Sequence, residues 1–169
     1  GDVDCDDQSA FARVTTGLES VTTRAVERIT VFAGDGGDNV TITDLVGTDV
    51  TTLDIGLSGA LDSGLGGAED NAETLLSGSG SSDTVADTVV VQATDTDSET
   101  FTVTTGAYSV ATNVQIDHNL TSNGYRIVLA GANRAEGDAL QILAGGGINT
   151  SGATDDTIDA SGVTTNALA

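Results

Sequence analysis

Apolar and polar residues alternate in short runs along most of the chain, and this period-2 pattern predicts strands. In the stretch RITVFAGDGGDNVTIT, residues 28–43, Ile29 and Val31 alternate with polar residues, and Val40 and Ile42 do the same. Such alternation places one set of side chains in a core and the other set in solvent. A turn made of Gly, Asp and Asn joins the two runs. The stretch therefore predicts a unit of strand, acidic turn and strand.

The same kind of run recurs along the chain at nearly even spacing. The second apolar residue of each run falls at Val31, Ile42, Ile55, Val91, Val103, Ile116, Leu129, Ile142 and Ile158. Apart from one gap of 36 residues, a short strand is expected roughly every 12 residues. This spacing is typical of a stacked solenoid or of a sandwich of short strands. We predict an all-β fold, a parallel β-solenoid of the β-helix or β-roll kind, with an antiparallel β-sandwich as the alternative.

The pattern divides the chain into three parts. Residues 1–27 form an acidic lead and cap, in which Phe11, Val14, Leu18 and Val21 have helical spacing, while the β-branched residues weaken a helix. A short helix and irregular strands that cap the end of the β stack are equally compatible with this segment. Residues 28–162 form the predicted β domain, with a long Gly- and Ser-rich loop at 56–87, and residues 163–169 form a C-terminal tail. The chain begins with Gly and shows no signal-peptide pattern, so we expect a processed product or a segment of a longer protein.

The composition supports thin strands over a bulky helical core. Aromatic residues make up 3% of the chain, Met and Trp are absent, and the apolar positions are mostly Val, Ile, Leu and Ala. Pro is also absent, so the turns depend on 22 Gly together with Asp, Asn and Ser.

The charge is strongly acidic, with 26 Asp and Glu against five Arg and a formal net charge of −21. This balance argues against binding to nucleic acid or to an anionic membrane surface. Divalent cations are the natural counterions, although salt-adapted proteins carry similar acidic surfaces. No apolar run reaches the roughly 18 residues that cross a bilayer, so we expect no membrane insertion.

The acidic turns are the candidate metal sites. In the first turn, Gly34 and Gly36 supply backbone freedom beside the carboxylates of Asp35 and Asp38. Later turns carry further carboxylates, at Asp95, Asp97, Asp155 and Asp156. Calcium takes six to eight oxygens at about 2.3 to 2.6 Å, more than one turn supplies. The alternative is a set of solvated acidic turns without bound metal.

Other candidate chemistry is weak. Asp117 and His118 are adjacent and point to opposite faces of an extended strand, which makes them a poor acid/base pair, and we expect His118 at the surface or in a loop. Cys5 lies among acids that raise a thiol pKa, so a reactive thiol is not expected. Acidic pairs are too common here to identify a polysaccharide-active enzyme, and we predict no enzymatic activity.

The layout resembles the hemolysin-type or RTX-like calcium-binding repeat regions of large secreted bacterial exoproteins. The similar stretches include VERITVFAGDGGDNVTITDLVGTDVTTLDIGL, ADTVVVQATDTDSETFTV, EGDALQILAGGG and DDTIDASG, and residues 33–41 (AGDGGDNVT) are similar to the calcium-binding nonapeptide of that family. The resemblance implies secretion, a parallel β-solenoid, and calcium between the turns of adjacent rungs. Carried over by position, Gly34, Gly36 and Asp38 take the turn and ligand places.

These observations predict a non-enzymatic, acidic structural domain that is secreted or displayed at the cell surface. An adhesin, an extracellular-matrix component or a filament subunit would fit, with calcium as the stabilising ion. The expected partners are neighbouring copies in an oligomer or filament, or other surface components. Two alternatives remain, a β-sandwich pilin or surface-layer module and a β-helical polysaccharide-active enzyme.

Overall fold

The structure, a computed structural model, describes residues 12–16, 19–23, 26–33, 36–43, 45–57, 85–93, 99–107, 113–119, 124–144 and 156–163. Regular structure in these ranges consists of strands, and they contain no helix long and apolar enough to cross a membrane. The strands are β1 (Ala12–Thr16), β2 (Glu19–Thr23), β3 (Arg28–Phe32), β4 (Asn39–Thr43), β5 (Thr52–Gly56), β6 (Thr88–Gln92), β7 (Thr100–Thr105), β8 (Val114–His118), β9 (Tyr125–Ala130), β10 (Ala139–Leu143) and β11 (Thr157–Gly162).

The all-β prediction is confirmed for the described residues. Each of the nine marked apolar positions lies in a different strand, from Val31 in β3 to Ile158 in β11. The helical alternative for the N-terminal part is wrong over the described residues, because β1 and β2 pair antiparallel with Val14 opposite Val21. The β-branched Val and Thr of this segment favour an extended backbone. Most of the predicted 56–87 loop lies outside the described residues.

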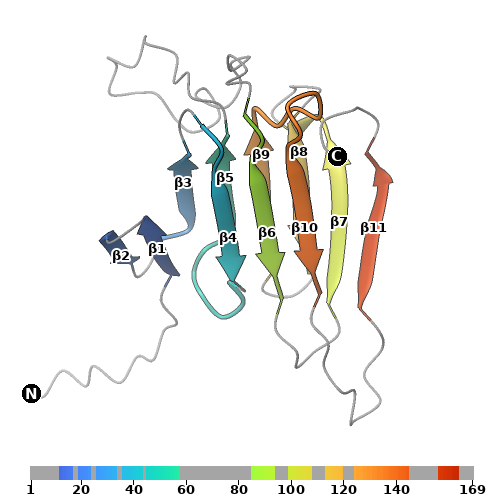
Figure 1. The fold of residues 1–169 in the computed structure, drawn as a ribbon. Helices are drawn as coiled ribbons and strands as arrows, with labels where there is room; N and C mark the ends of the chain where they lie inside the picture. The colour runs from blue at the N-terminus through green and yellow to red at the C-terminus, as the bar shows by residue number, and fades with distance from the viewer. Residues whose placement is uncertain are drawn as a thin grey trace, which may run out of the picture.

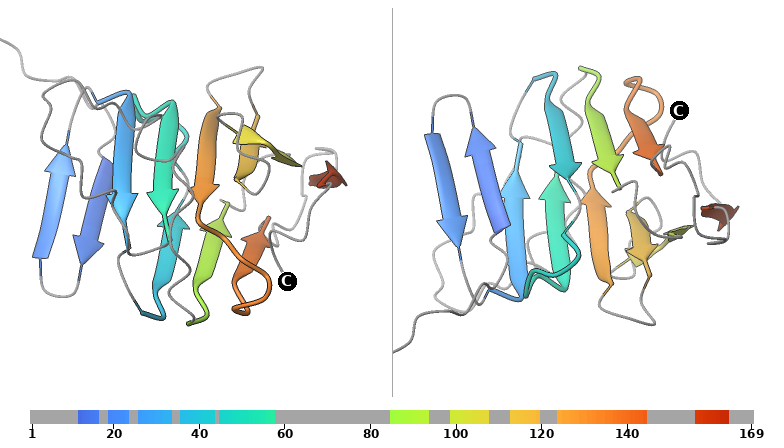
Figure 2. Two further views of the ribbon diagram at one scale, coloured as in Figure 1. Left: turned by 90° about the horizontal axis from the view of Figure 1, so that it is seen from above. Right: turned by 90° about the horizontal axis from the view of Figure 1, so that it is seen from below.

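Strands β3 to β11 form two sheets that face each other (Figures 1 and 2). The smaller sheet has the order β10-β6-β4, and all its strands run parallel. The larger sheet has the order β11-β7-β8-β9-β5-β3 and is mixed. In it, β3, β5 and β9 run parallel to one another. Strand β8 runs antiparallel to both of its neighbours, β9 and β7, and β11 is parallel to β7. The smaller sheet is therefore purely parallel, whereas the larger sheet contains both parallel and antiparallel pairs.

The chain passes repeatedly between the two sheets. It runs from β3 to β4, from β5 to β6, and from β9 to β10, and each step crosses from the larger to the smaller sheet. As a result, β3, β5 and β9 lie side by side in one layer, and β4, β6 and β10 lie side by side in the other. The register aligns apolar residues in rows. Val31, Ile55 and Leu129 form one row.

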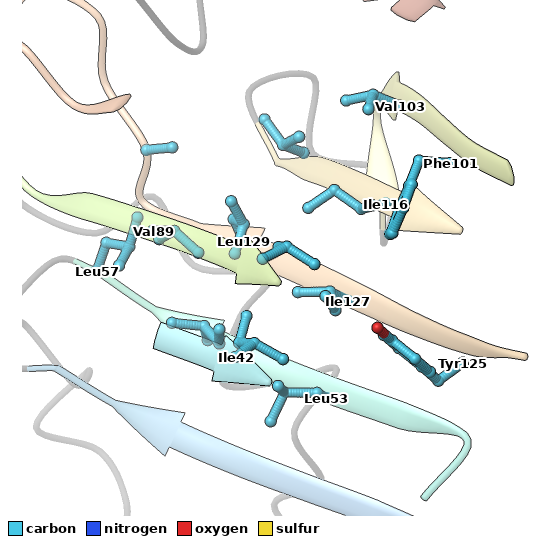
Figure 3. Close-up of a cluster of buried hydrophobic side chains, with 14 residues drawn as sticks. Ile42, Leu53, Leu57, Val89, Phe101, Val103, Ile116, Tyr125, Ile127 and Leu129 are labelled. Atoms are coloured by element: carbon cyan, nitrogen blue, oxygen red, sulfur yellow. The ribbon is translucent and has the colours of Figure 1, made fainter. Parts of the chain in front are cut away.

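The hydrophobic core fills the space between the two sheets (Figure 3). Ile55, Val89, Phe101, Ile116 and Leu129 are fully buried there. Burying one such side chain contributes about 1.5 to 3 kcal/mol. Most of the core consists of these aligned aliphatic rows, and Phe101 and Tyr125 are its two buried phenyl-ring side chains among the described residues.

His118 contradicts the expectation of a surface or loop residue. It is the last residue of β8, and its side chain is fully buried between Phe101 and Tyr125. The physical reason is its place in the alternation. His118 follows Val114 and Ile116 at intervals of two, so the strand turns all three toward the core. Asp117 points to the opposite face, as predicted, and pairs there with Arg126.

The core position of Leu129 can be tested against an exposed leucine. Leu129 is fully buried, whereas Leu143 at the end of β10 is 48% exposed. We expect Leu129→Ala to lower the free energy of unfolding by about 2 to 5 kcal/mol, because it leaves a cavity in a packed core. Leu143→Ala should change it by no more than about 0.5 kcal/mol. Urea unfolding measures both values, and equal losses would contradict the described core.

Candidate functional site

Three of the eight predicted metal-site residues lie in the described part of the structure. Gly36 has a φ of 112°, as expected for a glycine that forms a tight turn, and Asp38 immediately precedes β4. Asp156 precedes β11. The other five, Gly34, Asp35, Asp95, Asp97 and Asp155, lie outside the described residues.

The structure does not bring Asp38 and Asp156 together. Asp38 precedes β4 at the edge of the smaller sheet, and Asp156 precedes β11 at the far edge of the larger sheet. Within the described ranges, no group of three or more His, Cys, Asp or Glu side chains is placed to hold a metal ion. Asp38 is instead the first member of a row of aspartates.

Three aspartates lie in a row at the start of the smaller sheet. Asp38, Asp87 and Asp138 each precede a strand, β4, β6 and β10 respectively, and the strand register keeps them aligned. Asp87 and Asp138 are 2% and 1% exposed. Buried carboxylates of this kind require hydrogen-bond donors.

Backbone amides of the neighbouring strand supply those donors. The backbone N–H of Asp38 donates to Oδ1 of Asp87 at 2.7 Å, and the backbone N–H of Asp87 donates to Oδ1 of Asp138 at 2.9 Å. In return, the N–H of Thr88 donates to the carbonyl of Asp38 at 2.8 Å, and the N–H of Ala139 donates to the carbonyl of Asp87 at 2.9 Å. We call this reciprocal pair of bonds between adjacent parallel strands a carboxylate clamp.

A third carboxylate clamp joins β7 to β11 in the larger sheet. The backbone N–H of Glu99 donates to Oδ1 of Asp156 at 3.0 Å, and the N–H of Thr157 donates to the carbonyl of Glu99 at 2.8 Å. Asp156, a predicted calcium ligand, thus also binds the backbone of its neighbour. The clamp is therefore a repeated local device in both sheets.

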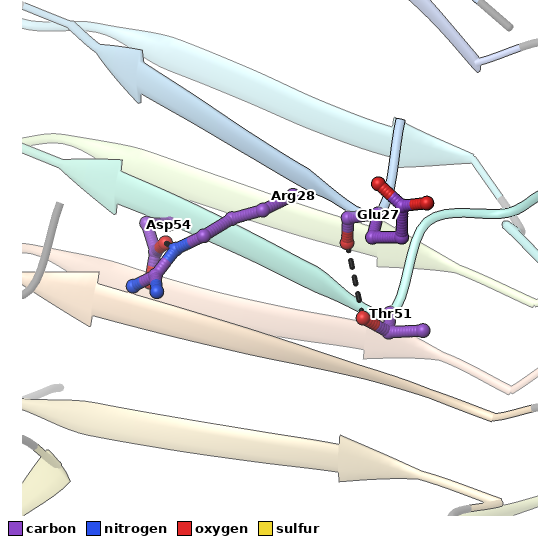
Figure 4. A network of polar contacts seen from close by, with 4 residues as sticks. All are labelled: Glu27, Arg28, Thr51 and Asp54. Atoms are coloured by element: carbon purple, nitrogen blue, oxygen red, sulfur yellow. Dashed lines mark hydrogen bonds and ion pairs between the residues drawn. The ribbon is translucent and has the colours of Figure 1, made fainter. Parts of the chain in front are cut away.

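The junction between β3 and β5 shows what happens where the aspartate is replaced (Figure 4). Thr51 occupies the position before β5, and its hydroxyl donates to the carbonyl of Glu27 at 3.0 Å. Beside this junction, the Arg28 guanidinium pairs with the fully buried carboxylate of Asp54, with Nε 2.6 Å from Oδ2. In a carboxylate clamp the side chain before the strand accepts a hydrogen bond from the neighbouring backbone. At this junction the Thr51 hydroxyl instead donates one to the neighbouring carbonyl.

The row of aspartates has different ends. At the β10 end, Oδ2 of Asp138 accepts the backbone N–H of Asn133 at 2.7 Å, and the side chain of Asn133 bonds Glu136 and the N–H of Ala135. Both oxygens of Asp138 are thus bonded within the chain. At the β4 end, Oδ2 of Asp38 is buried and has no hydrogen-bond donor. A ligand that paired with this buried oxygen would remove the free-energy cost of leaving it without a hydrogen bond.

A second polar group lies inside the core at the β7 and β8 end. Nε2 of His118 lies 3.7 Å from Oε1 of Glu99, and both side chains are almost fully buried. The His118 ring lies 4.6 Å from the Phe101 ring and 4.7 Å from the Tyr125 ring, measured between centroids. A substrate cannot reach this pair without opening the core. The arrangement is suited to holding β7, β8 and β9 together.

Sequence reasoning identified the strands but missed the clamps. The signal was present, because an acidic residue stands immediately before an alternating x-apolar-x-apolar run at Asp38, Asp87, Glu99, Asp138 and Asp156. The role of those acids depends on which strands are neighbours. Spacing along the chain does not specify that β6 lies between β4 and β10.

Comparison with protein-family models, with curated proteins and with solved structures finds no match to this chain. Carboxylates that accept backbone N–H groups hold parallel strands in register, and the unpaired Oδ2 of Asp38 offers one anionic ligand. A calcium site at Asp38 would need its other oxygens from the turn that contains Asp35, which is outside the described residues.

The clamp predicts that Asp87 is important for stability. Asp87→Ala removes the acceptor of the Asp38 N–H and should lower the free energy of unfolding by about 1 to 3 kcal/mol. Asp87→Asn keeps an acceptor oxygen and should lose less. Exposed Asp49 provides a control for charge removal, since Asp49→Ala should change stability by no more than about 0.5 kcal/mol. Urea unfolding of the variants measures these values; equal effects of Asp87→Ala and Asp49→Ala would contradict a stabilising clamp.

The buried Glu99–His118 pair predicts strong energetic coupling. In a double-mutant cycle with Glu99→Gln and His118→Phe, we expect a coupling energy of about 0.5 to 3 kcal/mol, because the two side chains are in a desolvated site. The Asp117–Arg126 pair is the control, since its arginine side chain is 41% exposed. Its coupling should be about 0.2 to 1 kcal/mol. A smaller coupling for the buried pair than for this control would be evidence against the described contact.

Proposed function

We propose that this chain is a non-enzymatic structural module of an extracellular or cell-surface assembly, such as an adhesin, a matrix component or a filament subunit. In this proposal, β3–β4, β5–β6 and β9–β10 are three rungs of a short parallel solenoid, and the β7–β8 hairpin extends one side of it. The supporting observation is the repeated carboxylate clamp, which joins equivalent positions of successive parallel strands.

The use of the polar groups favours a structural role. The carboxylates of Asp87, Asp138 and Asp156 are bonded to the backbone next to adjacent strands. Glu99 and His118 are buried together, and His118 lies against two aromatic rings. Such contacts fix strand register and specify packing. A structural extracellular domain needs such contacts to keep its strands in one arrangement. The net charge of −21 keeps such a domain soluble and hydrated.

Calcium is proposed as the stabilising ion, bound at the turn before β4. The support is the buried, unpaired Oδ2 of Asp38 next to the positive-φ turn at Gly36, together with the carboxylate of Asp35 in the same turn of the sequence. Hard oxygen ligands of this kind favour calcium over transition metals. Calcium binding at this turn would stabilise the end of the smaller sheet.

The calcium proposal predicts a specific rise in melting temperature. When free calcium exceeds its dissociation constant by about 100-fold, the native state gains about 2.7 kcal/mol, equivalent to roughly 5 to 10 °C for a chain of this size. Magnesium and sodium salts at equal ionic strength should give smaller shifts. Asp38→Asn should reduce the calcium-specific shift, whereas Asp49→Asn should leave it unchanged. Melting curves in chelator and in each salt test this, and identical shifts in calcium and magnesium would remove calcium from the proposal.

A further inference from the structure

We propose that the outer edge of β4 is a docking site for one parallel strand of a partner protein, and that this strand is basic at its first residue. The inference rests on the proposed structural role and specifies where the module joins its assembly. In the described part of the chain, β4 is the terminal strand of its sheet and pairs with β6 alone. Addition of a strand to such an edge is a common mode of peptide recognition.

The backbone of β4 is oriented to receive a strand. The carbonyl of Asp38 accepts the N–H of Thr88, so Asp38 directs its backbone groups toward β6. Backbone direction alternates along a strand, which turns the N–H and C=O groups of Asn39, Thr41 and Thr43 away from β6. These three residues therefore present a row of donors and acceptors at the edge.

The carboxylate clamps indicate that the docking strand is parallel. In each clamp of this sheet, the aspartate before one strand accepts the N–H that precedes the neighbouring strand, as Asp87 does for Asp38 and Asp138 does for Asp87. Asp38 holds the equivalent position on β4, and its Oδ2 is buried without a donor. A parallel strand beyond β4 would supply the missing N–H and extend the row by one clamp.

Two other terminal strands of the described sheets, β10 and β11, are less suited to docking. At the β10 edge, Asp138 has both carboxylate oxygens bonded, one of them to its own turn at Asn133. At the β11 edge, the register shifts between Asp159 and Gly162. Irregularities of this kind discourage further pairing. The unpaired carboxylate oxygen is therefore a property of the β4 edge.

Charge and packing define the occupant. A second copy would add a further formal net charge of −21 to the complex. A strand that begins with Lys or Arg would instead offset the negative charge of the Asp38 carboxylate. Half-buried Val40 faces the core at this edge, so the incoming strand should carry apolar residues at alternate positions to cover it. We infer an extended segment of a different protein, basic at its start and alternating Thr with Val.

A synthetic peptide of this kind, capped at both ends, tests the proposal on the intact chain. Backbone amide NMR at about 1 mM peptide, which detects even weak affinity, should show perturbation and slowed hydrogen exchange at Thr41 and Thr43. Replacing the peptide's first Lys by Glu should weaken binding several-fold at low salt, with a smaller difference at high salt. Asp38→Ala should weaken binding, and Asp49→Ala should not.

Matched controls separate edge pairing from nonspecific contact. N-methylation of the peptide amides that face β4 should abolish binding, whereas N-methylation of the opposite peptide edge should leave it intact. Thr41→Pro should block docking by removing an outward N–H, and Thr41→Val should not. Thr41→Pro can also abolish binding by unfolding β4. The N-methylated peptides distinguish these two causes, because they leave the protein unchanged.

Three results would overturn the proposal. They are no perturbation of β4, perturbation confined to β10 or β11, or equal binding of the two N-methylated peptides. Self-association that is blocked by Thr41→Pro and competes with the peptide would identify a second copy as the occupant instead. Calcium at Asp38 would compete for the same oxygen, so docking is measured in chelator and calcium-dependent melting is measured without peptide. Failure of docking is then distinguishable from failure of the structural proposal.

Discussion

The fold depends on carboxylates that bind the backbone of the adjacent strand. A parallel sheet of short strands has little local bonding to fix its register, because its partners are distant in sequence. In this chain, Asp87, Asp138 and Asp156 each accept the amide that precedes the neighbouring strand, and the neighbouring carbonyl is bonded in return. The clamp therefore sets where each pairing begins. The apolar rows follow from that register.

The register in turn accounts for a core built mostly from Val, Ile and Leu, with few aromatic side chains. Once Asp38, Asp87 and Asp138 are aligned, Ile42 and Val91 fall into one row that faces the opposite sheet. A slip by one residue would turn the apolar side chains outward. The same acids that make the chain so negative thus contribute to its hydrophobic packing. Part of the −21 charge is structural rather than a solvated surface.

The sequence predicts the strands well and their partners poorly. Alternation is a local property, so the apolar pairs from Ile29 and Val31 onward locate every strand from β3 to β11. Whether β8 pairs parallel or antiparallel depends on contacts between distant residues, and the pattern does not specify it. His118 is expected at the surface as a lone polar residue, but its position two residues after Ile116 turns it toward the core. Of the acids that precede strands, the sequence assigns only Asp38 and Asp156 to metal binding, and spacing along the chain does not specify the backbone partners of any of them.

The mixed order of the larger sheet also implies an order of events during folding. Val103 in β7 pairs with Ile116 in β8, 13 residues away, whereas Leu53 in β5 pairs with Ile127 in β9, 74 residues away. Closing the shorter connection costs less chain entropy, so local pairs form faster. Among β3 to β11, the antiparallel β7–β8–β9 segment is thus the part able to form first. The parallel strands β5 and β3 can then add to the edge of β9. The antiparallel β7–β8–β9 segment is thereby the template for the parallel part of the larger sheet.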